Sequence, residues 1–204
     1  MSMGRMVFTS AIFAALWTGN VATAQSTLNC TQDEIAVIQV GQVYGGLMLL
    51  TAGDYLGRLR NGGPADRFDY WFGDHTTALV DGVEATLTNV YYVLDEITYN
   101  CDCPDPEGRY AFVRSSDPRF HLRVCPLFLE STDPVGELGA TVVHELSHMF
   151  GTQDCMNPIP LCGPDDPVPF SPELAHEFAQ RDPVTATRNA YNLERFVTDV
   201  GRPR

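Results

Sequence analysis

Apolar residues recur at helical spacing in two long stretches of the chain. In the first stretch, residues 79–97, six apolar side chains step along one face by three or four residues at a time. These six are Leu79, Val83, Leu87, Val90, Leu94 and Ile97. The second stretch predicts a helix over residues 33–59, although Gly41, Gly45 and Gly46 interrupt its apolar pattern.

Two short segments in the middle of the chain are typical of strands. Residues 110–113 and 120–124 are rich in aromatic and β-branched side chains, and the polar residues 115–118 between them predict a hairpin loop. A third helix is predicted over residues 135–150. We therefore expect an α+β fold that is mostly helical, with a small antiparallel sheet beside this third helix.

The last part of the chain begins with a proline-rich loop, predicted at residues 155–170. Two short helices should follow, because Ser171-Pro172 and Asp182-Pro183 each place a capping residue before a proline. Neither a repeat nor a linker divides the sequence, which predicts a single domain.

The first 24 residues have the features of a secretory signal peptide in the correct order. Arg5 supplies a positive charge, residues 7–17 are mostly apolar, and Ala22-Thr23-Ala24 matches a small-residue cleavage site. A buried N-terminal helix is the alternative. The signal peptide is the better interpretation, so we expect a secreted, extracellular chain whose domain covers residues 25–204, with no segment that spans a membrane.

Charge and composition narrow the possible partners. The chain has 13 basic and 26 acidic residues, which give a formal net charge of −13. This charge argues against nucleic acid and anionic membranes and is compatible with cationic substrates. Hydrophobic residues make up 44% of the 204 positions, enough for a core, and we expect a monomer.

The six cysteines predict disulfides, because an exported chain with an even number of cysteines usually pairs them. They are Cys30, Cys101, Cys103, Cys125, Cys155 and Cys162. Six cysteines allow 15 pairings, so the spacing alone does not give the connectivity. Cys101 and Cys103 are too close to pair comfortably, whereas Cys155 and Cys162 could close the proline-rich loop.

The sequence His144-Glu145-Leu146-Ser147-His148 is an HExxH motif. On a helix, both histidines lie on one face and can bind the same Zn²⁺ ion, while the glutamate can face a water molecule. Zinc lowers the pKa of a bound water to about 7, so Glu145 can act as general base in peptide hydrolysis. An ordinary helix with two surface histidines is the alternative, and the exported chain favours the metal site.

A catalytic zinc needs a third protein ligand and one open position. Asp154 is the best candidate, because Gly151 lets the chain turn out of the helix and return a carboxylate to the metal. Two alternatives remain. Cys155 could bind as a thiolate, although a disulfide with Cys162 is favoured, and His176 could bind from the next helix.

Several separate stretches resemble the deuterolysin and peptidyl-Lys metalloendopeptidase family, also called aspzincins. That family combines HExxH with a downstream Gly-Thr-x-Asp, whose aspartate is the third zinc ligand. The matching residues here are His144, Glu145, His148, Gly151, Thr152 and Asp154. Further similarity covers residues 70–73, 101–103, 110–113, 124–128 and 189–196.

The resemblance implies a zincin-like fold, a zinc cofactor and protein or peptide substrates. It also implies that Cys30 pairs with Cys101 and Cys103 with Cys125, which leaves Cys155 and Cys162 for each other. Acidic side chains of the family's closing helix line the pocket for the residue after the scissile bond. By this resemblance, Tyr191 and Glu194 form the substrate pocket.

The chain departs from the family in three ways. Asp154 follows the second histidine more closely than usual, giving the spacing HExxHxxGxxD. Asn157 stands where the family has a tyrosine that can stabilise the oxyanion, and Tyr191 replaces a pocket aspartate. Because Glu194 is the one pocket acid retained, the resemblance implies only a loose preference for Lys or Arg after the scissile bond.

The sequence therefore predicts a secreted zinc metalloendopeptidase. One rival is a non-catalytic zinc-binding protein derived from a protease, but zinc binding alone would not need Glu145. The other is a disulfide-bonded effector or antigen, which would show no turnover.

Overall fold

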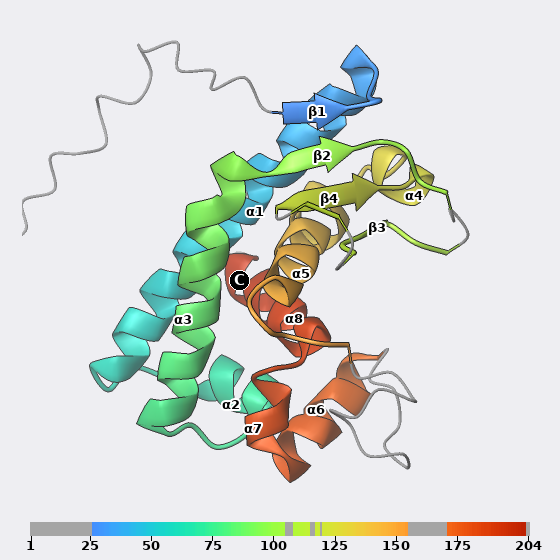
Figure 1. The fold of residues 1–204 in the computed structure, drawn as a ribbon. Helices are drawn as coiled ribbons and strands as arrows, with labels where there is room; N and C mark the ends of the chain where they lie inside the picture. Colours follow the sequence, from blue (N-terminus) through green and yellow to red (C-terminus); the bar gives the residue numbers. More distant parts are fainter. Residues whose placement is uncertain (1–25, 105–107, 115–116, 119, 155–170, 203–204) are drawn as a thin grey trace, which may run out of the picture.

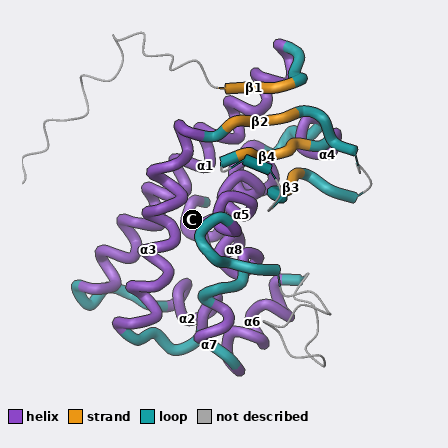
Figure 2. The backbone as a smooth tube through the Cα atoms, viewed as in Figure 1, coloured by secondary structure: helices purple, strands orange, loops and turns teal. Residues whose placement is uncertain are grey.

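The computed structural model describes residues 26–104, 108–114, 117–118, 120–154 and 171–202 (Figure 1). The predicted signal peptide, the proline-rich loop, Cys155, Asn157 and Cys162 lie outside the described residues. The described part is mostly helical, with one small sheet, which confirms the expected fold class. Figure 2 shows that the strands gather toward one end of the molecule, beside α4 and the first turns of α1, while most of the other helices lie below them.

The two helices predicted from apolar periodicity are present and lie side by side. They are α1 (Gln32–Arg60) and α3 (Thr77–Val93), which continues as a 3₁₀ turn, η1 (Leu94–Glu96). Thr31 caps α1 through a capping box with Glu34, so the sequence signal Thr-x-x-Glu marks its first turn. Across its length α1 buries one face against the core and leaves the opposite face toward solvent.

Shorter helices complete the domain. They are α2 (Asp66–Phe72), α4 (Pro126–Leu129), η2 (Pro134–Gly139), α5 (Ala140–His148), α6 (Pro172–Arg181), α7 (Pro183–Ala186) and α8 (Ala190–Gly201). The helix predicted over residues 135–150 begins as the π-helix η2 and continues as α5. Ser171 and Asp182 cap α6 and α7 as expected, but the last predicted helix is divided into α7 and α8.

The sheet corrects one prediction. Its order is β1 (Ser26–Leu28), β2 (Thr98–Asn100), β4 (His121–Val124) and β3 (Ala111–Phe112). Only the predicted hairpin, β3 with β4, is antiparallel, whereas β1–β2 and β2–β4 are parallel, so the sheet is mixed. Strands of three residues carry no readable alternation, which is why the sequence predicted only the hairpin.

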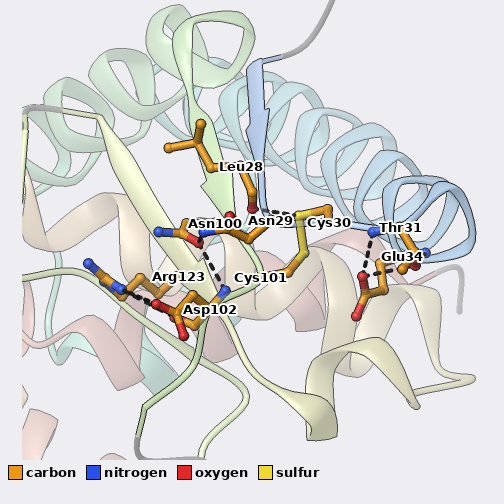
Figure 3. The surroundings of a disulfide bond; sticks show 9 residues. All are labelled: Leu28, Asn29, Cys30, Thr31, Glu34, Asn100, Cys101, Asp102 and Arg123. Atoms are coloured by element: carbon orange, nitrogen blue, oxygen red, sulfur yellow. Dashed lines mark hydrogen bonds and ion pairs between the residues drawn. A yellow bond between two sulfur atoms is a disulfide. The ribbon is translucent and has the colours of Figure 1, made fainter.

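Two disulfides join the ends of these strands. Cys30 is bonded to Cys101 and Cys103 to Cys125, the two pairings that the family resemblance implies. The first bond links the ends of β1 and β2, where Cys101 N–H also donates to the Leu28 carbonyl (Figure 3). The sheet end is therefore fixed covalently as well as by hydrogen bonds.

Glycines in α1 allow close packing against the segment that leads into α5. A Cβ added at Gly139 would lie 2.9 Å from the Gly45 backbone nitrogen, closer than real Cβ contacts. Gly41 is equally confined, because its added Cβ would lie 2.8 Å from the Phe128 ring. Two of the glycines that weaken the helical pattern of α1, Gly41 and Gly45, thus allow η2 to approach α1 closely, and α5 follows directly from η2.

Candidate active site

The helix α5 presents both histidines of the HExxH motif on one side. Val142, Val143 and Leu146 are fully buried and anchor the other side of α5 in the core. His144 and His148, one turn apart, have ring centroids 5.0 Å apart and nearly perpendicular planes at 87°. Metal-ligating atoms of His144, Glu145 and His148 all lie within 4.8 Å of one another.

Asp154 returns to these histidines after a sharp turn. Gly151 has a φ of +92°, a left-handed conformation that favours glycine, and it directs the chain away from the axis of α5. One oxygen of Asp154 lies 3.1 Å from His144 Nε2 and the other lies 3.6 Å from His148 Nε2. A short hydrogen bond of 2.5 Å between the Ser147 and Thr152 hydroxyls closes the turn.

These three side chains fit a zinc ion. Two ligand atoms bound tetrahedrally at about 2.0–2.2 Å from zinc lie roughly 3.3–3.6 Å apart. Each histidine Nε2 has one Asp154 oxygen at about this spacing, at 3.1 Å from His144 and, for the other oxygen, at 3.6 Å from His148. Two imidazoles and a carboxylate are also the donor types that zinc takes in catalytic sites.

Each histidine has a second partner on its other ring nitrogen. The Glu194 carboxylate on α8 lies 3.0 Å from His144 Nδ1, and the Thr152 carbonyl lies 3.1 Å from His148 Nδ1. Such partners hold the proton on Nδ1 and leave Nε2 free to bind a metal. The sequence did not predict either contact, although ligating histidines generally need a carboxylate or carbonyl partner.

Glu145 lies beside the edge strand β3. Burial raises the pKa of its carboxyl, and the nearby His144 and His148 oppose that rise. The Val113 backbone N–H donates a hydrogen bond to the carboxylate, which also favours the ionised form. A raised pKa brings the Glu145 carboxyl closer to the range that suits proton transfer near neutral pH.

The electrostatics of the site favour a negative Asp154. Burial opposes its ionisation, but hydrogen bonds from His144 and His148 outweigh burial and lower the pKa of Asp154. For His144, burial disfavours the charged form, yet the partners Asp154 and Glu194 raise its pKa well above the usual value.

The residues expected to form a substrate pocket have an unexpected neighbour. Besides its contact with His144, the Glu194 carboxylate lies 3.4 Å from Arg195, whose guanidinium carbon stands 4.8 Å from the Tyr191 ring centroid. Arg195 was not predicted, and it contacts both residues that the family resemblance assigns to the substrate pocket.

The alternative ligand His176 has another partner. It stacks on Tyr70, with ring centroids 4.1 Å apart, and its Nδ1 lies 2.8 Å from the Tyr70 carbonyl. The other alternative, Cys155, falls outside the described residues.

Comparison with known proteins agrees with this geometry. Residues 59–198, more than half of the chain, match the family described as lysine-specific metallo-endopeptidase, the aspzincins. A solved structure titled as a zinc peptidase from Grifola frondosa superposes with a TM-score of 0.66 at 21% identity. The match covers 83% of this chain and 97% of that one, which shows a common fold. No curated protein sequence matches. This chain therefore belongs to the aspzincin family and is a zinc metalloendopeptidase that acts on peptide substrates.

Proposed function

We propose that His144, His148 and Asp154 hold the zinc of this peptidase and that Glu145 is its general base. The convergence of both Asp154 oxygens on the two Nε2 atoms, at 3.1 Å and 3.6 Å, is the observation that carries the proposal. When bound, zinc supplies a Lewis acid for the peptide carbonyl and makes a nearby water acidic enough to react near neutral pH.

The protein's own groups then have separate tasks. Glu145 accepts the proton of the attacking water and later returns it to the leaving amine. The Val113 N–H keeps the Glu145 carboxylate in place. Glu194 and the Thr152 carbonyl orient His144 and His148 without touching the reacting atoms.

Zinc titration of the Asp154→Ala variant tests the ligand set. We expect zinc affinity to fall by more than about 100-fold. This is more than is usual when a residue that only hydrogen-bonds to a metal ligand is lost. Asp74→Ala, which removes an exposed aspartate near the start of α3, is the matched control and should bind zinc normally. Unchanged affinity in Asp154→Ala would show that another residue supplies the third ligand.

We also propose that the peptidase is secreted after removal of residues 1–24. The support is the signal-peptide pattern of these residues together with two disulfides, which persist in oxidising compartments. N-terminal sequencing of protein recovered from the medium should begin at or near Gln25. A product that stays in the cell with Met1 intact would contradict secretion.

The finer proposal concerns the residue after the scissile bond. Glu194 can attract a cationic side chain, but its pairing with Arg195 at 3.4 Å makes the attraction weak. All 13 basic residues of the chain are arginines. A peptidase that cleaves before lysine would therefore not digest its own unfolded chain, and this favours lysine over arginine as the recognised residue.

Digestion of two unfolded substrates separates these alternatives. The reduced, unfolded Glu145→Gln chain offers arginine but no lysine, whereas unfolded casein offers both. Preference for lysine predicts that casein is cleaved and the Glu145→Gln chain resists. Rapid cleavage of both, with arginine or other residues at the new N-termini, would rule out a preference for lysine.

A further inference from the structure

Two buried asparagines join the first turn of α8 to two neighbouring helices. Asn189 and Asn192 are both completely buried, and Asn189 Nδ2 donates a hydrogen bond of 2.6 Å to Asn192 Oδ1. Asn192 Nδ2 in turn donates to the Trp71 carbonyl of α2 at 2.7 Å and to the Ala175 carbonyl of α6 at 3.1 Å. Because buried amides need such partners, this network holds α8 in one position against α2 and α6 (Figure 1).

The start of α8 is also bonded to the segment that carries Asp154. Gln153 and Asn189 form an isolated parallel bridge. The Gln153 N–H donates to the Arg188 carbonyl at 2.9 Å, and the Gln153 carbonyl accepts from the Ala190 N–H at 3.0 Å. Asp154 is the next residue along the chain, so the place of its backbone depends on the start of α8.

Glu194 depends on the same turn. It follows Asn192 by two positions on α8, and its carboxylate lies 3.0 Å from His144 Nδ1. The start of α8 therefore supports the zinc site from two sides, through the backbone next to Asp154 and through the side chain that orients His144. A shift of this turn would displace both groups together.

We propose that Asn192 is a positioning residue for the zinc site, an inference that rests on the ligand set proposed above. It acts on Asp154 through Asn189 and the Gln153 bridge, and on His144 through the position of Glu194. Its own hydrogen bonds go to Asn189 and to backbone carbonyls of two other helices, so its effect on the metal is indirect.

A purely structural role for Asn192 makes a different prediction. A buried amide that only stabilises the fold changes the stability of the protein when it is removed, but the folded protein still binds zinc normally. A positioning residue changes both quantities. Asn192→Ala removes the partner of Asn189 and of the two backbone carbonyls, so the start of α8 loses the constraint that places Asp154 and Glu194.

Zinc affinity of the folded variants, measured by competition with a chromophoric chelator, separates the two roles. Asn192→Ala should bind zinc at least about tenfold more weakly, in the range typical of residues that support metal ligands. Asn189→Ser keeps a capping side chain for α8 but loses the bond to Asn192, so it should also bind more weakly. Ile38→Ala, which truncates a completely buried side chain on α1, is the control for lost stability and should bind zinc normally.

Cobalt substitution gives a second measurement that stability alone does not change. The visible absorption bands of bound Co²⁺ depend on the geometry of its ligands. These bands should shift in Asn192→Ala and Asn189→Ser and match wild type in Ile38→Ala. Circular dichroism confirms that each variant is folded, and Asn189→Ser decides the matter if Asn192→Ala does not fold.

Asp154→Ala in the same titration keeps the two proposals apart. If Asp154→Ala binds zinc weakly while both asparagine variants behave like Ile38→Ala, Asn192 is not a positioning residue and the ligand set stands. If Asp154→Ala binds zinc normally, the ligand set itself is wrong, and the inference about Asn192 falls with it.

Discussion

The Glu194 carboxylate lies 3.0 Å from Nδ1 of His144, fifty positions away along the chain. This contact joins α8, the last helix of the domain, to the helix that carries the HExxH motif. It gives Glu194 a role in orienting a proposed zinc ligand, alongside or in place of the pocket role that the resemblance implied.

Replacing Glu194 distinguishes these two roles. If Glu194 orients His144, Glu194→Ala should lower zinc affinity about 10–100-fold, the usual effect of losing such a partner. Glu194→Gln, which keeps an acceptor for His144 Nδ1, should fall between wild type and alanine. Competition with a chromophoric chelator measures the zinc affinity of each variant, and Glu177→Ala on α6 is the control. Normal zinc affinity combined with altered cleavage preference would instead favour the pocket role.

The packing of α1 against η2 can be tested with two glycines. Gly139→Ala would place a methyl group 2.9 Å from the Gly45 nitrogen, so we expect a loss of about 1–3 kcal/mol in the free energy of unfolding. In Gly57→Ala, which is also on α1, the added methyl group would meet nothing within 4 Å. This variant should be as stable as wild type or more stable by up to about 1 kcal/mol. Urea unfolding of both variants decides the matter, and equal effects would contradict the close packing.

Acid should remove one contribution to stability near the sheet. The Arg123 side chain on β4 donates two hydrogen bonds to Asp117, of 2.8 Å and 3.1 Å, and lowers the pKa of that carboxyl. A lowered folded-state pKa stabilises the protein above the unfolded pKa, about 3.9, and the contribution is lost as pH falls through the folded value.

The Asp117→Asn variant isolates this contribution. Wild type should be more stable than the variant at pH 7, and the difference should shrink as pH drops below about 4. Because the pair is near the surface, we expect a difference of no more than about 1 kcal/mol at pH 7. A difference that grows in acid would have the wrong sign.

The sequence predicted those parts of the fold that repeat a pattern over many residues. The stripe of α3 and the apolar positions of α1 were readable because a long helix repeats its signal. The helix α2 and the strands β1 and β2 were not, since seven or three residues are too few to show a period. The parallel pairing of β1 with β2 brings together strands that α1, α2 and α3 separate in the sequence, which no local pattern records.

The residues of the candidate site likewise fall into two groups, those that form a local sequence motif and those that only the fold brings together. His144, Glu145 and His148 form a local motif, and the Gly151 turn made Asp154 a reasonable candidate. Glu194, by contrast, is distant in sequence, and its contact with His144 arises only when α8 packs beside α5. The Val113 N–H is a backbone group, which leaves no signature in residue types at all.

The most direct test of the account compares wild type with Glu145→Gln in zinc content and in cleavage of casein. The substitution keeps the size of the side chain and removes the base. We predict one zinc per chain in both proteins, chelator-sensitive cleavage by wild type, and a rate at least about 100-fold lower for the variant. A zinc-loaded Glu145→Gln protein that cleaves casein at nearly the wild-type rate would contradict the mechanism proposed for this site.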